Sequence, residues 1–281
     1  MTKTDILLSR IAAEDAILIT VHASRGSVPR EKGAWMAVFA HDAMGTVGGG
    51  HVEFQAMTQA RQRFSGEPGE SIVRYALGPA LGQCCGGEVQ LRFERVGLAD
   101  RTRLQESLKV ARHPVALFGG GHVGQALVRV LAPLPLQVTW IDSRDGVFPD
   151  DVAPEVDCDH SDPVQAAVKG LASGSMVLIM SFSHAEDLEV VAACLLRQRR
   201  QADLPFVGLI GSQTKWATFR HRLEARGFTS QELDHLTCPI GIAGISGKEP
   251  EVIAVAVAAQ LLQILGRKVF IPSHHQNIDP G

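Results

Sequence analysis

Two adjacent cysteines in a glycine-rich segment are the residues of this sequence best suited to chemistry. Cys84 and Cys85 follow Gln83 and are followed by two glycines. Neighbouring Cα atoms lie about 3.8 Å apart, less than the roughly 4.4 Å that a disulfide usually spans, so we expect two free thiols. Thiolates bind soft metals and can carry sulfur, so the pair predicts a metal-binding or sulfur-carrying site. The alternative is that both cysteines serve only in packing.

A glycine cluster next to a cationic loop predicts an anion site in the same part of the chain. Three consecutive glycines come just before a predicted helix over residues 52–64, and they are Gly48, Gly49 and Gly50. Backbone N–H groups at such a helix start can bind an anion. The upstream loop, residues 24–33, carries Arg25 and Arg30. We expect the two segments to bind a phosphate or a pterin. The alternatives are a tight turn with a helix cap and a loop that is merely solvated.

A third glycine motif predicts a dinucleotide site. Residues 119–124 read Gly-Gly-Gly-His-Val-Gly, which fits the pattern G-x-G-x-x-G. The motif follows a predicted strand and opens a predicted helix over residues 123–131, the context that this fingerprint requires. In such a motif Gly119 permits a tight turn, Gly121 lets the backbone approach a pyrophosphate, and Gly124 allows close packing of helix and strand.

Two residues after the next predicted strand bear on the kind of nucleotide. Asp142 stands 18 residues after Gly124 and could accept a hydrogen bond from a ribose 2′-hydroxyl, as in NAD binding. Arg144 could instead meet a 2′-phosphate, as in NADP binding. The alternative is a Rossmann-like fold whose nucleotide site is unused. An NAD(P)-dependent oxidoreductase is the alternative function, although Tyr75, the single tyrosine, lacks the lysine four residues later that a short-chain dehydrogenase would have.

The elements that position these motifs form two patterns. The C-terminal part alternates short apolar runs with helical patterns, which predicts a Rossmann-like parallel sheet covered on both faces. Its predicted strands are residues 115–118, 137–141, 176–181, 206–210 and 238–242. The N-terminal part is less regular and predicts a smaller α+β or α/β domain, with strands at residues 16–23, 34–40, 71–75 and 88–96. Because Pro114 disfavours helix continuation before it, we expect domains at residues 1–112 and 113–281.

Composition narrows the class of protein. Hydrophobic residues make up 45% and charged residues 20%, an ordinary globular balance, and the net charge of −3 offers no excess of cations for a nucleic acid. The cysteines include no C-x-x-C pair, so we expect no structural zinc. Residues 1–15 lack the apolar core of a signal peptide, and residues 253–266 are too short to span a membrane. We expect a soluble cytoplasmic protein that binds neither nucleic acid nor membrane.

Taken in order, the motifs resemble the XdhC/CoxI family, the accessory proteins of bacterial xanthine dehydrogenases. The resemblance rests on residues 26–30, 45–53, 82–87 and 118–124, and it extends to residues 208–212 and 247–250. It covers nearly the whole chain.

The resemblance implies a chaperone of the molybdenum cofactor (molybdopterin) rather than an enzyme. Such a protein protects the cofactor, supports its sulfuration by a cysteine desulfurase, and inserts it into apo-xanthine dehydrogenase or a related molybdenum hydroxylase of purine catabolism. Cys84 or Cys85 would then hold the molybdenum or the transferred sulfur, with Gln83 beside an oxo ligand. The arginines and glycines of the N-terminal part would hold the phosphate. We further expect a homo-oligomer such as a dimer.

Overall fold

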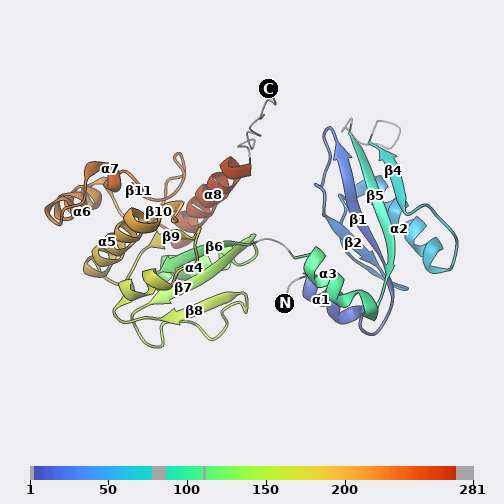
Figure 1. The fold of residues 1–281 in the computed structure, drawn as a ribbon, viewed down its shortest axis with the longest axis horizontal. Coiled ribbons are helices and arrows are strands. Elements are labelled where there is room, and N and C mark those ends of the chain that lie inside the picture. The colour runs from blue at the N-terminus through green and yellow to red at the C-terminus, as the bar shows by residue number, and fades with distance from the viewer. Residues whose placement is uncertain (1–2, 78–86, 110–111, 270–281) are drawn as a thin grey trace, which may run out of the picture. The chain divides into compact units, whose positions relative to one another are not determined.

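The computed structural model of the chain describes residues 3–77, 87–109 and 112–269. The chain divides into two compact units, residues 1–110 and residues 111–281. Each unit contains a β-sheet of its own (Figure 1).

The N-terminal unit is built on an antiparallel sheet with the strand order β3-β2-β1-β5-β4. Its elements are α1 (Lys3–Arg10), β1 (Ala16–Arg25), β2 (Trp35–Val38), β3 (Ala43–Gly45), α2 (Gly50–Phe64), β4 (Ile72–Ala76), β5 (Glu88–Val96), η2 (Leu98–Asp100) and α3 (Arg101–Ser107). The antiparallel pairing decides between the two predicted classes for this unit, and the unit is α+β.

Both faces of this sheet are covered, which explains why β1 is apolar at successive positions. Ile17 and Ile19 belong to the cluster that includes the inner face of α2, where Val52, Ala56 and Ala60 recur at a spacing of four. The residue between them, Leu18, packs with residues of α1 and α3 on the opposite side. Side chains alternate between faces along a strand, so a strand covered on both sides needs an apolar residue at every position.

The C-terminal unit is built on a parallel sheet with the strand order β8-β7-β6-β9-β10-β11. Its elements are β6 (His113–Phe118), α4 (His122–Leu131), β7 (Leu136–Asp142), β8 (Val156–His160), η3 (Val164–Gly170), β9 (Met176–Ile179), α5 (His184–Gln201), β10 (Phe206–Leu209), α6 (Gln213–Ala225), α7 (Ser230–Leu233), β11 (Leu236–Thr237) and α8 (Pro250–Val269). With the strands numbered along the chain, this is the 3-2-1-4-5-6 order of the Rossmann fold. The predicted fold class is confirmed.

Helices cover the two faces of the parallel sheet from opposite sides. Val115 and Leu117 of β6 pack in the cluster that contains residues of α4 and α8. Ala116 and Phe118 pack with residues of α5 and α6 on the other face. The ligand-binding edge of such a sheet lies at the carboxyl ends of its strands, where the order reverses between β6 and β9.

The last strand differs from the sequence prediction. Residues 238–242 are not a strand; β11 instead comprises Leu236 and Thr237 and ends before Cys238. Pro239 has no N–H to donate to a ladder, so the apolar run after it cannot extend the sheet. In the described residues, no helix combines the length and the apolar character that crossing a membrane requires.

Candidate functional site

The cationic loop, residues 24–33, begins in the last two residues of β1 and lies directly against the glycine turn before α2. A Cβ atom on Gly48 would lie 2.5 Å from Cγ of Pro29 and 3.8 Å from Cγ of Arg30. Gly48 has a φ of 136°, in the left-handed region that favours glycine. The structure therefore brings together two of the segments that the sequence singled out, the loop with Arg30 and the glycine turn.

The same loop contacts the beginning of β5. Arg25 pairs with Glu88 in the register of β1 and β5, and a Cβ atom on Gly87 would lie 2.3 Å from the carbonyl oxygen of Ser27. The Leu77 N–H donates to the Gly87 carbonyl at 2.7 Å, so the end of β4 and the start of β5 meet at this place. Gly87 therefore packs against the backbone of the cationic loop.

The predicted cysteine site lies outside the described residues, and so does its neighbour. These residues are Gln83, Cys84 and Cys85. Of the described cysteines, Cys194 is buried, Cys158 is exposed and Cys238 is half-buried. Within the described ranges, no group of three or more His, Cys, Asp or Glu residues is arranged to hold a metal ion.

The glycine turn already contains an acceptor from its own helix. One carboxylate oxygen of Glu53 accepts hydrogen bonds from the Thr46 hydroxyl at 2.5 Å, the Val47 N–H at 3.1 Å and the Gly49 N–H at 3.0 Å. The Gly48 N–H donates to the Thr46 hydroxyl oxygen at 3.1 Å. A carboxylate at a helix N-terminus is stabilised both by these donors and by the helix dipole.

These bonds change what the glycine turn can offer to a ligand. The sequence prediction treated Gly48, Gly49 and Gly50 as three unoccupied donors, and two of the three N–H groups have acceptors within the protein. A phosphate can use the Gly49 N–H only after Glu53 leaves it. Phosphate binding by these glycines stays a prediction.

The charge on Glu53 follows from the same contacts. Partial burial raises the pKa of the Glu53 carboxyl, but the hydrogen bonds from Thr46, Gly49 and Val47 lower it more, and the net shift is downward. The carboxylate is therefore ionised at neutral pH. Sequence reasoning missed its role, although an acidic residue in the first turn of a predicted helix is a recognisable signal.

The two arginines predicted to bind phosphate are both on the surface. Arg25 and Arg30 are exposed, and neither side chain forms an ion pair with any described residue. Arg25 at the end of β1 and Arg30 on the loop after it, neither paired within the described ranges, make residues 24–33 a positively charged segment next to the glycine turn. Such groups suit a phosphate, to which arginine can donate two parallel hydrogen bonds.

The glycine motif of the C-terminal unit is packed tightly at three of its four glycines. A Cβ atom on Gly119 would lie 2.0 Å from the Met180 carbonyl oxygen, and one on Gly124 would lie 2.0 Å from the Gly119 carbonyl oxygen. At Gly120, a Cβ atom would lie 2.7 Å from Cγ2 of Val147. The predicted reasons for Gly119 and Gly124, a tight turn and close packing of helix and strand, match these distances.

Gly121 differs from its neighbours. Beyond its own chain neighbours, no atom of the described residues lies within 4 Å of the position that its Cβ would occupy, and its φ of −72° is one that any residue adopts. Gly121 is the N-cap of α4, so the open space lies at the start of this helix. The protein's own packing does not require a glycine there.

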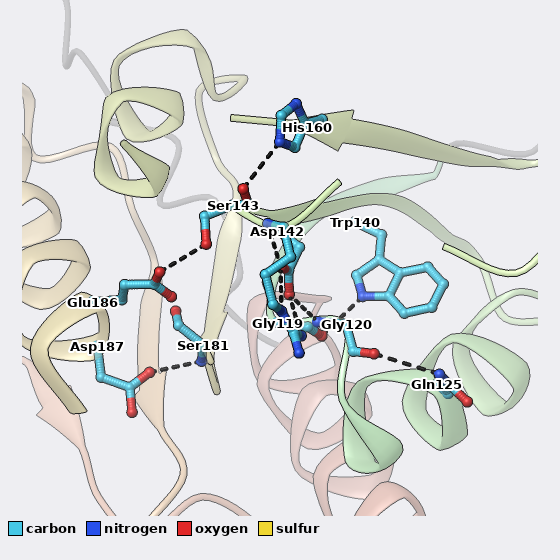
Figure 2. A network of polar contacts seen from close by, with 11 residues as sticks. Gly119, Gly120, Gln125, Trp140, Asp142, Ser143, His160, Ser181, Glu186 and Asp187 are labelled. Carbon is cyan, nitrogen blue, oxygen red and sulfur yellow. Dashed lines mark hydrogen bonds and ion pairs between the residues drawn. The ribbon is translucent and has the colours of Figure 1, made fainter. Parts of the chain in front are cut away.

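Asp142 lies at the end of β7 and holds the glycine motif in place. It is only 2% exposed, and Figure 2 shows it next to Gly120. The Gly120 N–H donates to one carboxylate oxygen at 2.6 Å. Arg144 donates three further hydrogen bonds to the same carboxylate, from its backbone N–H, Nε and Nη2, each at 2.9 Å. Burial raises the pKa of Asp142, but these bonds outweigh it, and the net pKa is lowered.

A second polar network lies after β9 on the same edge of the sheet. Asp187 accepts the Ser181 N–H at 2.7 Å and the Lys215 ammonium at 2.6 Å (the Ser181 contact is drawn in Figure 2). The Lys215 ammonium also donates to the Ile210 carbonyl at 2.9 Å. The ion pair is nearly inaccessible to water, with 3% of the Asp187 side chain and 11% of the Lys215 side chain exposed. It ties α5 and α6 to the ends of β9 and β10, and the sequence analysis did not identify it.

Comparisons with known proteins agree with this architecture. The chain is 25% identical to "Uncharacterized protein YqeB" of Escherichia coli (strain K12) over 264 residues, which cover 89% of this chain and 44% of that protein. The chain thus spans less than half the length of this curated relative. A solved structure from Bacillus halodurans, described as a xanthine dehydrogenase, superposes with a TM-score of 0.75 at 20% identity and covers 99% of this chain and 98% of that one. That likeness shows a shared fold.

Two family matches cover most of the chain. Residues 10–76 match the XdhC and CoxI family, and residues 115–261 match the XdhC Rossmann domain. The second match alone spans more than half of the sequence. The predicted resemblance is therefore confirmed, and the chain belongs to the XdhC and CoxI family.

Proposed function

We propose that the chain is an accessory protein of xanthine dehydrogenase or a related molybdenum hydroxylase, and that it carries the enzyme's molybdenum cofactor instead of catalysing a reaction. Family membership supports the accessory role. The observation that carries the binding role is the cationic loop with Arg25 and Arg30, which lies against the glycine turn and against Gly87. The Bacillus halodurans protein described as a xanthine dehydrogenase shares the fold, and the proposal takes no support beyond the fold from it.

The residues of this loop fit the anionic end of the cofactor. Arg25 and Arg30 are exposed and have no ion-pair partner in the described part of the chain, so they can neutralise a phosphate without breaking an existing pair. The Gly49 N–H fits less well, because Glu53 already uses it. In this proposal the arginines bind the phosphate first, and the glycine turn positions Arg30 through its contact with Pro29. The bound cofactor would supply the molybdenum centre of the client enzyme.

The thiols of Cys84 and Cys85 are proposed to hold the molybdenum, or the sulfur supplied by a cysteine desulfurase. Both residues precede Gly87 closely in the sequence, and Gly87 lies beneath the cationic loop. The proposal therefore assigns the phosphate and the molybdenum end of one cofactor to neighbouring parts of the N-terminal unit.

Cofactor retention tests the binding role. The full chain is purified from a host that makes molybdenum cofactor, and bound molybdenum and pterin fluorescence are measured. We expect both signals in the native protein. In the double variant Arg25→Gln/Arg30→Gln we expect the affinity for the cofactor to fall at least about tenfold, and both signals to fall with it, since each charge-assisted bond contributes roughly 1.5–3 kcal/mol. Arg61→Gln, an exposed arginine on α2, is the matched control. A native protein without pterin, as expected of an NAD(P)-dependent oxidoreductase, contradicts the proposal.

Replacing the thiols tests the second half of the proposal. Cys84→Ser and Cys85→Ser keep the size of the side chain but remove the soft, acidic sulfur. We expect at least one variant to fold normally and yet lose bound molybdenum or fail to activate an apo-xanthine dehydrogenase. If the double serine variant retains full loading and full activation, the cysteines are structural.

A further inference from the structure

Helix α8 is apolar on every side, although one of its faces lies on the surface. Between residues 250 and 266, one glutamate and two glutamines are its only polar residues. The inner face is buried in the cluster that also contains residues of α4. On the outer face, Val255 is 52% exposed and Leu262 is 41% exposed. Because a helix that is apolar all round is normally buried all round, we expect the outer face of α8 to be covered by another surface.

The outer face carries a stripe of apolar and small residues with the spacing of a coiled-coil seam. Val255, Ala259, Leu262 and Gly266 follow one another at intervals of four, three and four residues, which places them along one side of the helix. Ala259 is half-buried, and Gly266 is exposed. Such a stripe fits the side of a second helix that lies alongside.

Gly266 indicates that a second backbone approaches closely. Beyond its chain neighbours and its own helix, no described atom lies within 4 Å of the position that a Cβ would occupy, so the packing of the described residues does not require a glycine there. A glycine within a helix destabilises it by roughly 0.5–1 kcal/mol relative to alanine. A helix that packs closely against this position would account for the glycine.

The order of sizes along the stripe fits a second copy of α8 in the antiparallel orientation. In such a pair, Val255 lies opposite Gly266 of the second copy, and Ala259 lies opposite Leu262, so each large residue meets a small one. In a parallel pair each residue would meet its own counterpart. Two leucines would then face each other next to a gap between two glycines.

The charges at the two ends of α8 favour the same orientation. Glu251 is exposed in the first turn, and the sequence of the last turn contains Arg267 and Lys268. An antiparallel pair brings the acidic end of one helix next to the basic end of the other, and it also aligns the two helix dipoles favourably. A parallel pair would bring like charges together.

We propose that the outer face of α8 binds the same face of a second copy of this chain, with the two helices antiparallel and related by a two-fold axis. A surface that meets its own counterpart in this way closes as a dimer. Because one pair of helices is a small interface, we expect a dimer that dissociates on dilution. The contact belongs to the C-terminal unit, so it does not depend on cofactor binding by the N-terminal unit.

Sedimentation velocity of the purified full chain over a range of concentrations tests whether this face is used. We expect the native protein to change from monomer to dimer as its concentration rises. Leu262→Lys places a charge in the contact, and we expect it to raise the dissociation constant at least about tenfold. The matched control is Leu196→Lys on α5, which covers the opposite face of the sheet. Leu196 is 38% exposed, close to the value for Leu262, and this control should dimerise like the native protein.

Disulfide trapping tests the orientation and does not depend on the stability of Leu262→Lys. In the double variant Val255→Cys/Gly266→Cys the two cysteines are about 16 Å apart along one helix, too far to bond within a chain. Across the antiparallel pair they lie opposite each other. We expect mild oxidation by air to produce a covalent dimer of the double variant, and not of Val255→Cys alone or of the native protein.

Four results would each overturn the proposal. They are a native protein that is monomeric at every concentration, a dissociation constant that Leu262→Lys leaves unchanged, no covalent dimer of the double cysteine variant, and a covalent dimer of Val255→Cys alone. The first result would mean that the outer face of α8 is covered by something other than a second copy.

Discussion

At the scale of single residues, Glu53 determines the structure of the glycine turn. Its carboxylate accepts hydrogen bonds from Thr46, Val47 and Gly49, and a glutamine would offer a neutral and weaker acceptor. We predict that Glu53→Gln lowers the free energy of unfolding of the N-terminal unit by about 1–2 kcal/mol at pH 7. Urea denaturation of the two proteins measures this difference.

The pH dependence of the Glu53 effect has a definite sign. The pKa of this carboxyl is lower in the folded protein than in the unfolded chain, so its stabilisation is complete above the ordinary glutamate pKa of about 4.3 and is lost as the pH falls through the folded value. The difference between the native protein and Glu53→Gln should therefore shrink on acidification from pH 7 to below about pH 4. Glu67→Gln, at an exposed position, should show neither effect. A difference that stays constant with pH would contradict this explanation.

The buried pair of Asp187 and Lys215 supports a second prediction at this scale. Lys215→Met would leave the Asp187 carboxylate buried without its cation, and we predict that it lowers the free energy of unfolding by about 3–5 kcal/mol. The double variant Asp187→Asn/Lys215→Met removes both charges and should lose less. Urea denaturation measures the free energy of unfolding of both variants. If Lys215→Met is as stable as the double variant or more stable, the two residues do not stabilise the protein as a pair.

At the scale of elements, the junction of β6 and α4 depends on some of its glycines and not on others. Gly124→Ala would place a methyl group 2.0 Å from the Gly119 carbonyl oxygen, which must push helix and strand apart. At Gly121 the added methyl group meets open space and the backbone needs no special conformation. We predict a loss of about 3 kcal/mol or more for Gly124→Ala and less than about 1 kcal/mol for Gly121→Ala. Thermal unfolding measures both, and equal losses would contradict the packing argument.

The elements that the sequence predicted share a strong local signal. The runs that became β6, β7, β9 and β10 are apolar, end near glycine or polar residues, and alternate with helical patterns, which leaves little choice but a parallel sheet. By contrast, β8 reads Val-Asp-Cys-Asp-His, with four of its five residues exposed at the sheet edge. No apolar run marks such a strand, and its place follows only from pairing with β7.

The candidate sites also contain features that the local sequence predicts and contacts that it does not. The glycine spacing of residues 119–124 predicted a strand, a turn and a helix, because a side chain does not fit at Gly119 or Gly124. That Arg144 would fold back onto Asp142, and Glu53 onto Gly49, depends on where side chains meet in space. The sequence shows which charged residues are present, but it does not show whether each of them contacts a ligand or another residue of the protein.

At the scale of the whole molecule, each unit has a hydrophobic core of its own. The buried clusters in the described residues of the N-terminal unit contain residues between Leu7 and Leu108, and those of the C-terminal unit contain residues between Val115 and Leu265. We predict that residues 1–109 and residues 112–281, produced separately, each unfold in a cooperative transition. Circular dichroism during heating tests this, and a fragment without a transition would show that its core depends on the other unit.

Glu53 also bears on how tightly the N-terminal unit could hold the phosphate that we propose it binds. Its carboxylate competes with any ligand for the N–H groups of the glycine turn. A phosphate could therefore bind these groups only in the fraction of molecules in which the Glu53 side chain has moved away. The observed affinity is the intrinsic affinity multiplied by that fraction. When the phosphate departs, the carboxylate would return to the Val47 and Gly49 N–H groups. If the chain carries the cofactor as proposed, such an exchange would favour its release, because the phosphate would be held less tightly than by a turn whose N–H groups had no acceptor.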